Sequence, residues 1–314
     1  MIQDYLFPGN VNEAVTLLAQ KSGLAKIFAG GTSLLLDGKE MAGNPEYFVD
    51  LSKIEELDGI SEKDGFIFVG ANTTLAQCAV HPLILKNAPA LALASGNLGS
   101  TQIRNVATVA GNVVAAKPFA DTAVILTALE AICVVRSKEG NREVAMADMF
   151  ARLGESVVDS GAELITHIKF PARKPGEGNA YERLELRNAL SYPLVNVAVN
   201  LGLNKKTITK ASIVAAPLAP GPRRISAAEQ FLIDRPPTEE NFAQAGQLAS
   251  ENAKFSSSPQ TCRAKKTDVC LYDICHYCIN PVQCSAQYRH QVLPVLVRRA
   301  LITAAGIAVQ DCRC

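Results

Sequence analysis

The chain has 314 residues, a length that suggests about two domains. Its 31 Lys and Arg residues nearly balance its 30 Asp and Glu residues, so bulk charge favours neither nucleic acid nor an anionic membrane as a partner. Hydrophobic residues make up 48% of the chain, enough for sizeable cores, whereas aromatic residues make up 6% and Trp is absent. This composition excludes a disordered chain and argues against a base-stacking surface.

We expect a cytoplasmic protein that does not enter a membrane. The N-terminus carries Asp4 and lacks a basic region followed by an apolar stretch, so it does not look like a secretory signal. The longest apolar run, 123–135, is too short to span a bilayer and contains Glu130. Cysteines cluster late in the chain: seven of the nine lie in residues 262–314. In a reducing compartment such clusters bind metal more often than they form disulfides.

The first half alternates helical and extended patterns. A helix is expected from Asn10, with Glu13 in a capping-box position, and another from Thr74 with Gln77. Strands are expected over 26–29, 47–50 and 66–70, followed by a helix over 120–130 and a hairpin over 132–146.

A stretch rich in Pro, Gly and charge, 170–178, predicts a domain boundary. We therefore divide the chain into a first domain, 1–172, and a second domain, 173–314. The second domain is expected to contain strands over 180–186, 194–203 and 207–216 and then helices over 227–234, 239–251 and 288–309. Ser226 with Glu229 and Thr238 are the expected caps of the first two helices. The predicted class is α+β, with helices packed on strands.

Two glycine-containing turns are candidate phosphate sites. The first follows a short strand and reads Ala29-Gly30-Gly31-Thr32-Ser33; the second reads 107–112, with Asp121 nine residues later. Glycine lets a ligand approach the backbone, and consecutive N–H groups form an anion-binding concavity. An ordinary strand-to-helix turn has the same pattern, so each turn alone is weak support. Together they can serve the two phosphates of a dinucleotide.

The sequences FAGGTSLLL (28–36) and TQIRNVATVAGNVVAA (101–116), followed by Asp121, resemble the two signatures of the FAD-binding subunit of molybdenum hydroxylases. This family includes xanthine dehydrogenases and carbon monoxide dehydrogenases. The segments 181–192 and 288–301 resemble its C-terminal flavoprotein domain. The resemblance implies a two-part FAD-binding domain of the vanillyl-alcohol-oxidase (PCMH) type, followed by a smaller α+β domain.

The resemblance also implies which residues contact FAD. The loop from Lys26 to Leu34 would wrap the pyrophosphate, Asp121 would contact sugar or ribityl hydroxyls, and Tyr192 would lie over the isoalloxazine as the residue nearest the chemistry. One departure is Ala110, where glycine is usual in the family; a methyl group there is tolerated if φ is negative. The full set of implied cofactor contacts is Lys26, Ile27, Ala29, Gly30, Gly31, Thr32, Ser33, Leu34, Leu98, Thr108, Gly111, Asn112, Asp121, Ile165 and Arg183.

The cysteine spacing marks an insertion at about 256–287 relative to the family. Cys270, Cys275, Cys278 and Cys284 can surround a [4Fe–4S] cluster or a zinc ion, and Cys262 is a spare candidate ligand. The redox setting of a flavoprotein favours iron–sulfur; zinc and free thiols remain alternatives. Cys78 and Cys133 have apolar neighbours and are expected to fill the core, while Cys312 and Cys314 have no assigned role.

The resemblance implies a FAD-carrying electron-transfer subunit of a multi-subunit oxidoreductase. Molybdopterin and a [2Fe–2S] centre are expected only in partners, a large and a small subunit, and the external acceptor would be NAD or ferredoxin. No hydrolytic triad or HExxH motif is present, which agrees with cofactor-borne chemistry. Two alternatives stay open: a stand-alone FAD oxidase or dehydrogenase, and a zinc-stabilised non-catalytic scaffold. The substrate would be set in the partner subunit.

Overall fold

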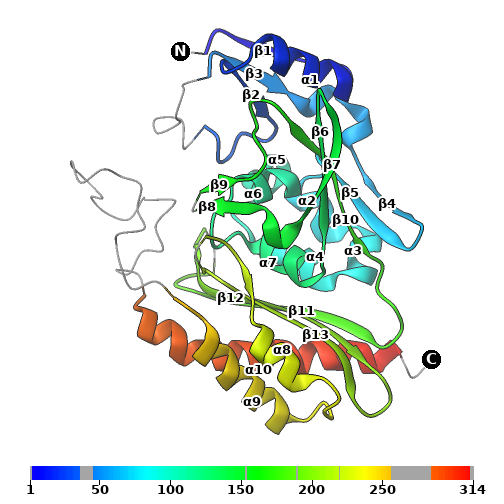
Figure 1. Cartoon of the computed structure of the whole chain (residues 1–314), viewed down its shortest axis with the longest axis vertical. Coiled ribbons are helices and arrows are strands. Elements are labelled where there is room, and N and C mark those ends of the chain that lie inside the picture. The colour runs from blue at the N-terminus through cyan, green and yellow to red at the C-terminus, as the bar shows by residue number, and fades with distance from the viewer. Residues whose placement is uncertain are drawn as a thin grey trace.

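The structure is a computed structural model that describes residues 2–35, 45–152, 154–188, 190–218, 220–255 and 284–311. The described part of the chain contains helices and three main sheets, arranged in two lobes (Figure 1). The helices are α1 (Val11–Gln20), α2 (Leu75–Val80), α3 (Pro82–Asn87), α4 (Pro89–Asn97), α5 (Thr101–Val106), α6 (Val109–Val114), α7 (Asp121–Ala128), α8 (Ser226–Leu232), α9 (Glu239–Asn252) and α10 (Ala286–Asp311). The expected α+β class is confirmed.

The first lobe has two sheets. A small parallel sheet has the order β1-β3-β2, and an antiparallel sheet has the order β4-β5-β10-β6-β7. Their strands are β1 (Asp4–Leu6), β2 (Ala25–Phe28), β3 (Tyr47–Asp50), β4 (Ile60–Lys63), β5 (Phe66–Gly70), β6 (Ile132–Ser137), β7 (Gly140–Ala145) and β10 (Leu164–Pro171), and β8 (Phe150–Arg152) pairs separately with β9 (Glu155–Ser156). The predicted hairpin over 132–146 is thus β6 and β7.

Helix caps in this lobe follow the sequence pattern. The Asn10 side chain accepts a hydrogen bond from the Glu13 N–H, and Thr74 and Gln77 form a complete capping box. Cys78 and Cys133 are buried, as expected, and burial raises the pKa of their thiols to about 11 and about 12, so both remain protonated core side chains.

The second lobe is an antiparallel sheet, β11-β12-β13-β14, with helices on both faces. Its strands are β11 (Glu177–Glu185), β12 (Pro193–Leu203), β13 (Ile208–Ala216) and β14 (Arg223–Arg224). One face packs against α8 and α10, on which α9 packs in turn, and the other face packs against α4 and α7 of the first lobe (Figure 1). Burial on both faces explains why β12 is apolar along nearly its whole length rather than alternating.

One predicted cap is wrong. Thr238 caps α9, but Ser226 is the first residue of α8 and makes no cap hydrogen bond; Ile225 occupies the cap position. Glu229 is drawn away from the helix terminus because its carboxylate accepts from the Ile213 N–H at 2.8 Å and pairs with Arg224. The Glu229 carboxylate is therefore bound to the sheet and does not take part in a capping box at the start of α8.

Helix α10 carries an apolar stretch, and one side of the helix lies in the core of the second lobe. An 18-residue window within Ala286–Gln310 has a mean hydropathy of 1.8, so by length and composition alone this helix could cross a membrane. In the structure it packs along β11, β12 and α9. Contact with the sheet is close: a Cβ added to Gly178 would lie 2.0 Å from the Ala304 carbonyl oxygen.

Gly178→Ala is expected to lower the free energy of unfolding by about 1–3 kcal/mol, because the added methyl group must push α10 away from β11. Gly306→Ala on the same helix meets no atom within 4 Å and should be neutral or stabilising by up to about 1 kcal/mol, since alanine is the better helix former. Urea denaturation of both variants checks this, and equal midpoints would contradict the close approach.

Candidate functional site

The two glycine turns lie against each other. A Cβ added to Gly30 would lie 1.9 Å from the Val106 carbonyl oxygen, so the backbone of the first turn touches the start of the second. Gly31 has φ +67°, a conformation that favours glycine. Both turns are therefore held at one place by a backbone contact that only glycine permits.

The first turn presents unused donors. Within the described part of the chain, the backbone N–H groups of Gly31, Thr32, Ser33 and Leu34 donate no hydrogen bond, whereas the Leu35 N–H donates to the Gly31 carbonyl at 3.0 Å. The turn is only partly buried, which leaves these groups open to a ligand. Consecutive free N–H groups fit a phosphate anion. Lys26 and Ile27 precede them on β2.

The second turn begins α6. The Thr108 hydroxyl accepts from the Gly111 N–H at 3.0 Å, and Gly111 itself is exposed, with no side chain to block an approaching ligand. Asn112 accepts from the Thr122 hydroxyl at 2.6 Å, which ties this turn to the start of α7. Ala110 lies inside α6 and has no positive φ, so its methyl group causes no backbone strain.

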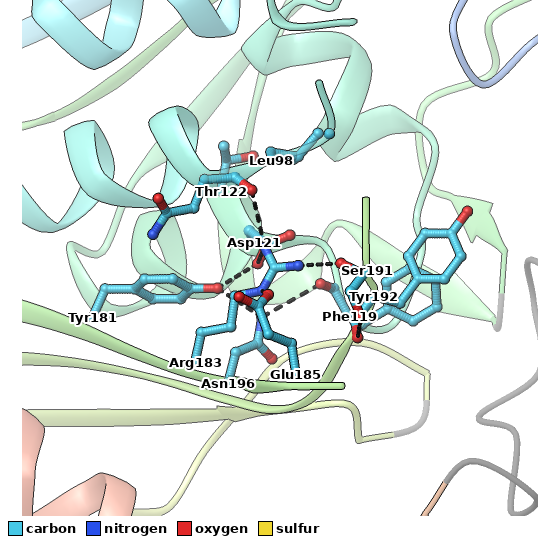
Figure 2. Close-up of polar contacts among 12 residues, drawn as sticks. Leu98, Phe119, Asp121, Thr122, Tyr181, Arg183, Glu185, Ser191, Tyr192 and Asn196 are labelled. Carbon is cyan, nitrogen blue, oxygen red and sulfur yellow. Dashed lines mark hydrogen bonds and ion pairs between the residues drawn. The ribbon is translucent and has the colours of Figure 1, made fainter. Parts of the chain in front are cut away.

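Asp121 is the buried centre of the site. It is the first residue of α7 and is 5% exposed; its Oδ1 accepts from the Tyr181 hydroxyl and from Arg183 Nη1, at 3.0 Å for the arginine (Figure 2). Burial raises the pKa of the Asp121 carboxyl, and the Arg183 charge opposes this rise. Burial and the neighbouring Asp121 also raise the pKa of the Tyr181 hydroxyl, which stays a neutral donor.

The second lobe supplies the partners of Asp121 through strand periodicity. Tyr181, Arg183 and Glu185 alternate along β11 and so point to one face, and Asn196 faces Arg183 across the ladder. Asn196 Nδ2 lies 3.3 Å from the Tyr181 hydroxyl and Glu185 pairs with Arg183 at 2.5 Å. The strand face thus carries a connected polar group against α7.

Arg183 also makes contacts with two backbone carbonyl groups, one next to Tyr192 and one next to Leu98. Its guanidinium donates to the carbonyl of Ser191, next to Tyr192, and Nη1 lies 3.5 Å from the Asn97 carbonyl, next to Leu98. The Tyr192 ring is 43% exposed and packs against Phe119 with ring centroids 4.6 Å apart. Arg183 therefore sets the backbone beside Leu98 and Tyr192, the two residues predicted to border a flavin.

The structure brings some of the predicted site residues together and places others elsewhere. The second turn, Asp121 and Arg183 join in one chain of contacts, with the first turn packed against its start. Ile165 is 4% exposed on β10, inside the core of the first lobe. Cys284 is buried just before α10, and Cys262, Cys270, Cys275 and Cys278 lie outside the described residues. Among the residues that the structure describes there is no cluster of three or more metal-ligating side chains.

Sequence reasoning missed Tyr181, Asn196, Thr122 and Phe119. The two-residue alternation of Tyr181, Arg183 and Glu185 was the available signal for one of them, because it places Tyr181 on the face that carries Arg183. Asn196, Thr122 and Phe119 join the site through pairing and packing across the lobes, which no local pattern shows.

This arrangement of two glycine turns and a buried carboxylate in an α+β frame defines a dinucleotide-binding flavoprotein. Residues 1–173 match the family described as FAD binding domain in molybdopterin dehydrogenase, and residues 179–271 match the CO dehydrogenase flavoprotein C-terminal domain.

Individual relatives agree. The carbon monoxide dehydrogenase medium chain of Hydrogenophaga pseudoflava is 30% identical over 246 residues, 78% of this chain and 85% of that protein. The nicotinate dehydrogenase FAD-subunit of Eubacterium barkeri is 28% identical, over 76% of this chain and 82% of that protein. A solved carbon monoxide dehydrogenase structure from Hydrogenophaga pseudoflava superimposes with a TM-score of 0.84 over 98% of both chains, at 27% identity. This chain belongs to the family of FAD-binding subunits of molybdenum hydroxylases, which are oxidoreductases.

Tyr181→Phe is expected to lower the free energy of unfolding by about 1–3 kcal/mol, because it removes a donor from the buried Asp121 carboxylate. Tyr288→Phe, at an exposed tyrosine on α10, is the matched control and should change little. Thermal unfolding of both variants checks this. If Tyr181→Phe unfolds at the same midpoint as the control, the Tyr181–Asp121 hydrogen bond does not contribute to the free energy of unfolding as expected.

Proposed function

We propose that this chain is the FAD-carrying electron-transfer subunit of a multi-subunit molybdenum hydroxylase, passing electrons between partner iron–sulfur centres and an external acceptor. The observation that carries the proposal is the convergence of both glycine turns and Asp121 in a chain of this family. FAD, when bound, supplies the redox chemistry. The protein supplies binding, orientation and electrostatics.

The residues fit that cofactor. The free N–H groups of Gly31 to Leu34 would bind the pyrophosphate, and the exposed Gly111 lets it approach the second turn. Tyr181 and Arg183 both use Oδ1 of Asp121, so among the described side chains Oδ2 is left as the acceptor for a sugar or ribityl hydroxyl. Tyr192, supported by Phe119, would cover the isoalloxazine.

The proposed partners are a molybdopterin-binding large subunit and a [2Fe–2S] small subunit, with NAD or ferredoxin as the external acceptor. Support comes from the relatives, since matched proteins are named medium chains or FAD-subunits of dehydrogenases. We propose a cytoplasmic complex, because clustered cysteines such as those in 262–314 bind metal more often than they form disulfides in a reducing compartment.

Protein purified with its co-purifying subunits is expected to be yellow-brown and to release FAD. Gly30→Ala should weaken FAD binding by at least about tenfold, or about 1.4 kcal/mol, because the methyl group forces the two turns apart. Gly96→Ala, inside α4 with a nearest atom at 3.7 Å, is the control and should bind FAD normally. Flavin fluorescence titration measures both.

Two results would contradict this function. A colourless protein that does not bind added FAD supports a non-catalytic scaffold instead. Oxidation of a small alcohol or aldehyde by the isolated chain, without partner subunits, supports a stand-alone flavin enzyme.

We propose further that Cys270, Cys275, Cys278 and Cys284 bind a [4Fe–4S] cluster, with zinc as the second candidate. Support comes from the cysteine spacing and from Cys284, which is a buried free thiol in the structure. The cluster would extend the electron route to or from FAD.

Anaerobically purified protein is expected to contain about four iron atoms per chain in this cluster, in addition to iron brought by partners. Cys278→Ser should lose them, whereas Cys312→Ser near the C-terminus should keep them. Iron analysis and EPR of both variants provide the measurement. Background iron with one zinc per chain would rule out the iron–sulfur form.

A further inference from the structure

A polar cavity of about 140 Å³ lies between the two lobes, at the opposite end of α7 from Asp121. Leu129, which follows α7, lines the cavity about 12 Å from Asp121 along the helix axis. On the second lobe the cavity lies at the end of the sheet next to Gly178, which packs against Ala304 of α10. Cys284 precedes Ala304 by about 20 residues, or about 30 Å of helix. The cavity is therefore separate from both the glycine turns and the cysteine-rich segment.

Asn200 of β12 points into this cavity with its amide unpaired. Asn200 pairs with Asn179 of β11, so the two side chains lie on the same face of the sheet. The Asn179 side chain reaches the first lobe, where its Nδ2 donates to the Asn87 carbonyl at 3.0 Å. Asn200 is 7% exposed, and within the described part of the chain its amide makes no hydrogen bond; the hydroxyl of Ser212, opposite it on β13, is likewise buried without a partner there. Buried polar groups are normally hydrogen-bonded, so this amide favours a ligand in the cavity.

Positive charge is in excess around the cavity. Three cations line it, Arg173, Lys174 and Lys210, against one carboxylate, that of Glu177. Arg173 bridges the lobes, because its Nε donates to a carbonyl of α3 at 2.9 Å and its Nη1 donates to the Glu177 carbonyl at 3.0 Å. Lys210 pairs with Glu130 at 2.7 Å, across the same interface. Cations grouped around a buried amide favour an anionic ligand.

We propose that this cavity binds a small tetrahedral oxyanion, phosphate or sulfate, which joins the two lobes at the end of their interface that lies away from Asp121. A cavity of about 150 Å³ accommodates a molecule of the size of benzene, so a phosphate ion fits here and a nucleotide does not. The Asn200 amide would donate to one oxygen, and Arg173 and Lys210 would neutralise the charge from two sides. A tetrahedral ion accepts hydrogen bonds from several directions, as donors on separate elements require.

The test is equilibrium dialysis of the full chain against radiolabelled phosphate, with excess FAD present to occupy the glycine turns. Saturable binding of one phosphate per chain is expected, and sulfate should displace it. Asn200→Leu should weaken binding by at least about tenfold, because the donor is replaced by an apolar group of similar size. Lys210→Gln should also weaken binding by about tenfold, whereas Lys205→Gln, which removes the same charge from the exposed hairpin after β12, should bind as the wild type does. Circular dichroism shows whether each variant is folded.

Three results would overturn this site. Without saturable phosphate binding in the wild-type chain, the cavity holds water only. Binding that Asn200→Leu and Lys210→Gln both leave unchanged occurs elsewhere on the chain. Competition by AMP as strong as that by sulfate means that the ligand is a phosphate ester and not a free ion. Should Asn200→Leu fail to fold, the difference between Lys210→Gln and Lys205→Gln decides the question.

Discussion

The hydrogen-bonded group of Asp121, Tyr181 and Arg183 joins the two lobes, and the site depends on it. Asp121 begins a helix of the first lobe, whereas its two donors lie on one strand of the second. A buried carboxylate is destabilising unless it is paired and hydrogen-bonded. The Asp121 carboxylate therefore gains its two donors only when the two lobes pack together. The exposed ion pairs of Glu130 with Lys210 and Arg224 cross the same interface but lie nearer to solvent, where such pairs contribute little.

From that interaction the polar contacts run outward in two directions. Thr122, next to Asp121, holds Asn112 of the second glycine turn, which in turn lies against the first. On the other side Arg183 holds the backbone beside Tyr192. A change at Asp121, Tyr181 or Arg183 is therefore expected to affect both the phosphate end and the ring end of the predicted cofactor site, although Asp121 and Tyr181 are buried.

Local sequence patterns predicted most elements of the fold, because their causes are local. Side chains close in sequence determine the Asn10 and Thr74 caps, the hairpin of β6 and β7, and the strands of the second lobe. The cap assigned to Ser226 failed because Glu229 pairs with a strand and with Arg224 instead. Likewise the glycine motifs predicted the two turns, but their contact at Gly30 and Val106 and the part played by Asn196 arise only from tertiary packing.

The tight packing of α9 on α10 has a consequence for the segment that connects these two helices. A Cβ on Gly246 would lie 2.6 Å from the Pro294 carbonyl oxygen, so the two helices are held together independently of the chain that connects them. With both ends fixed, lengthening the connection costs only a slowly growing loop-closure entropy. The connection between residues 255 and 284 can therefore change in length at little cost in free energy while α9 and α10 stay packed together.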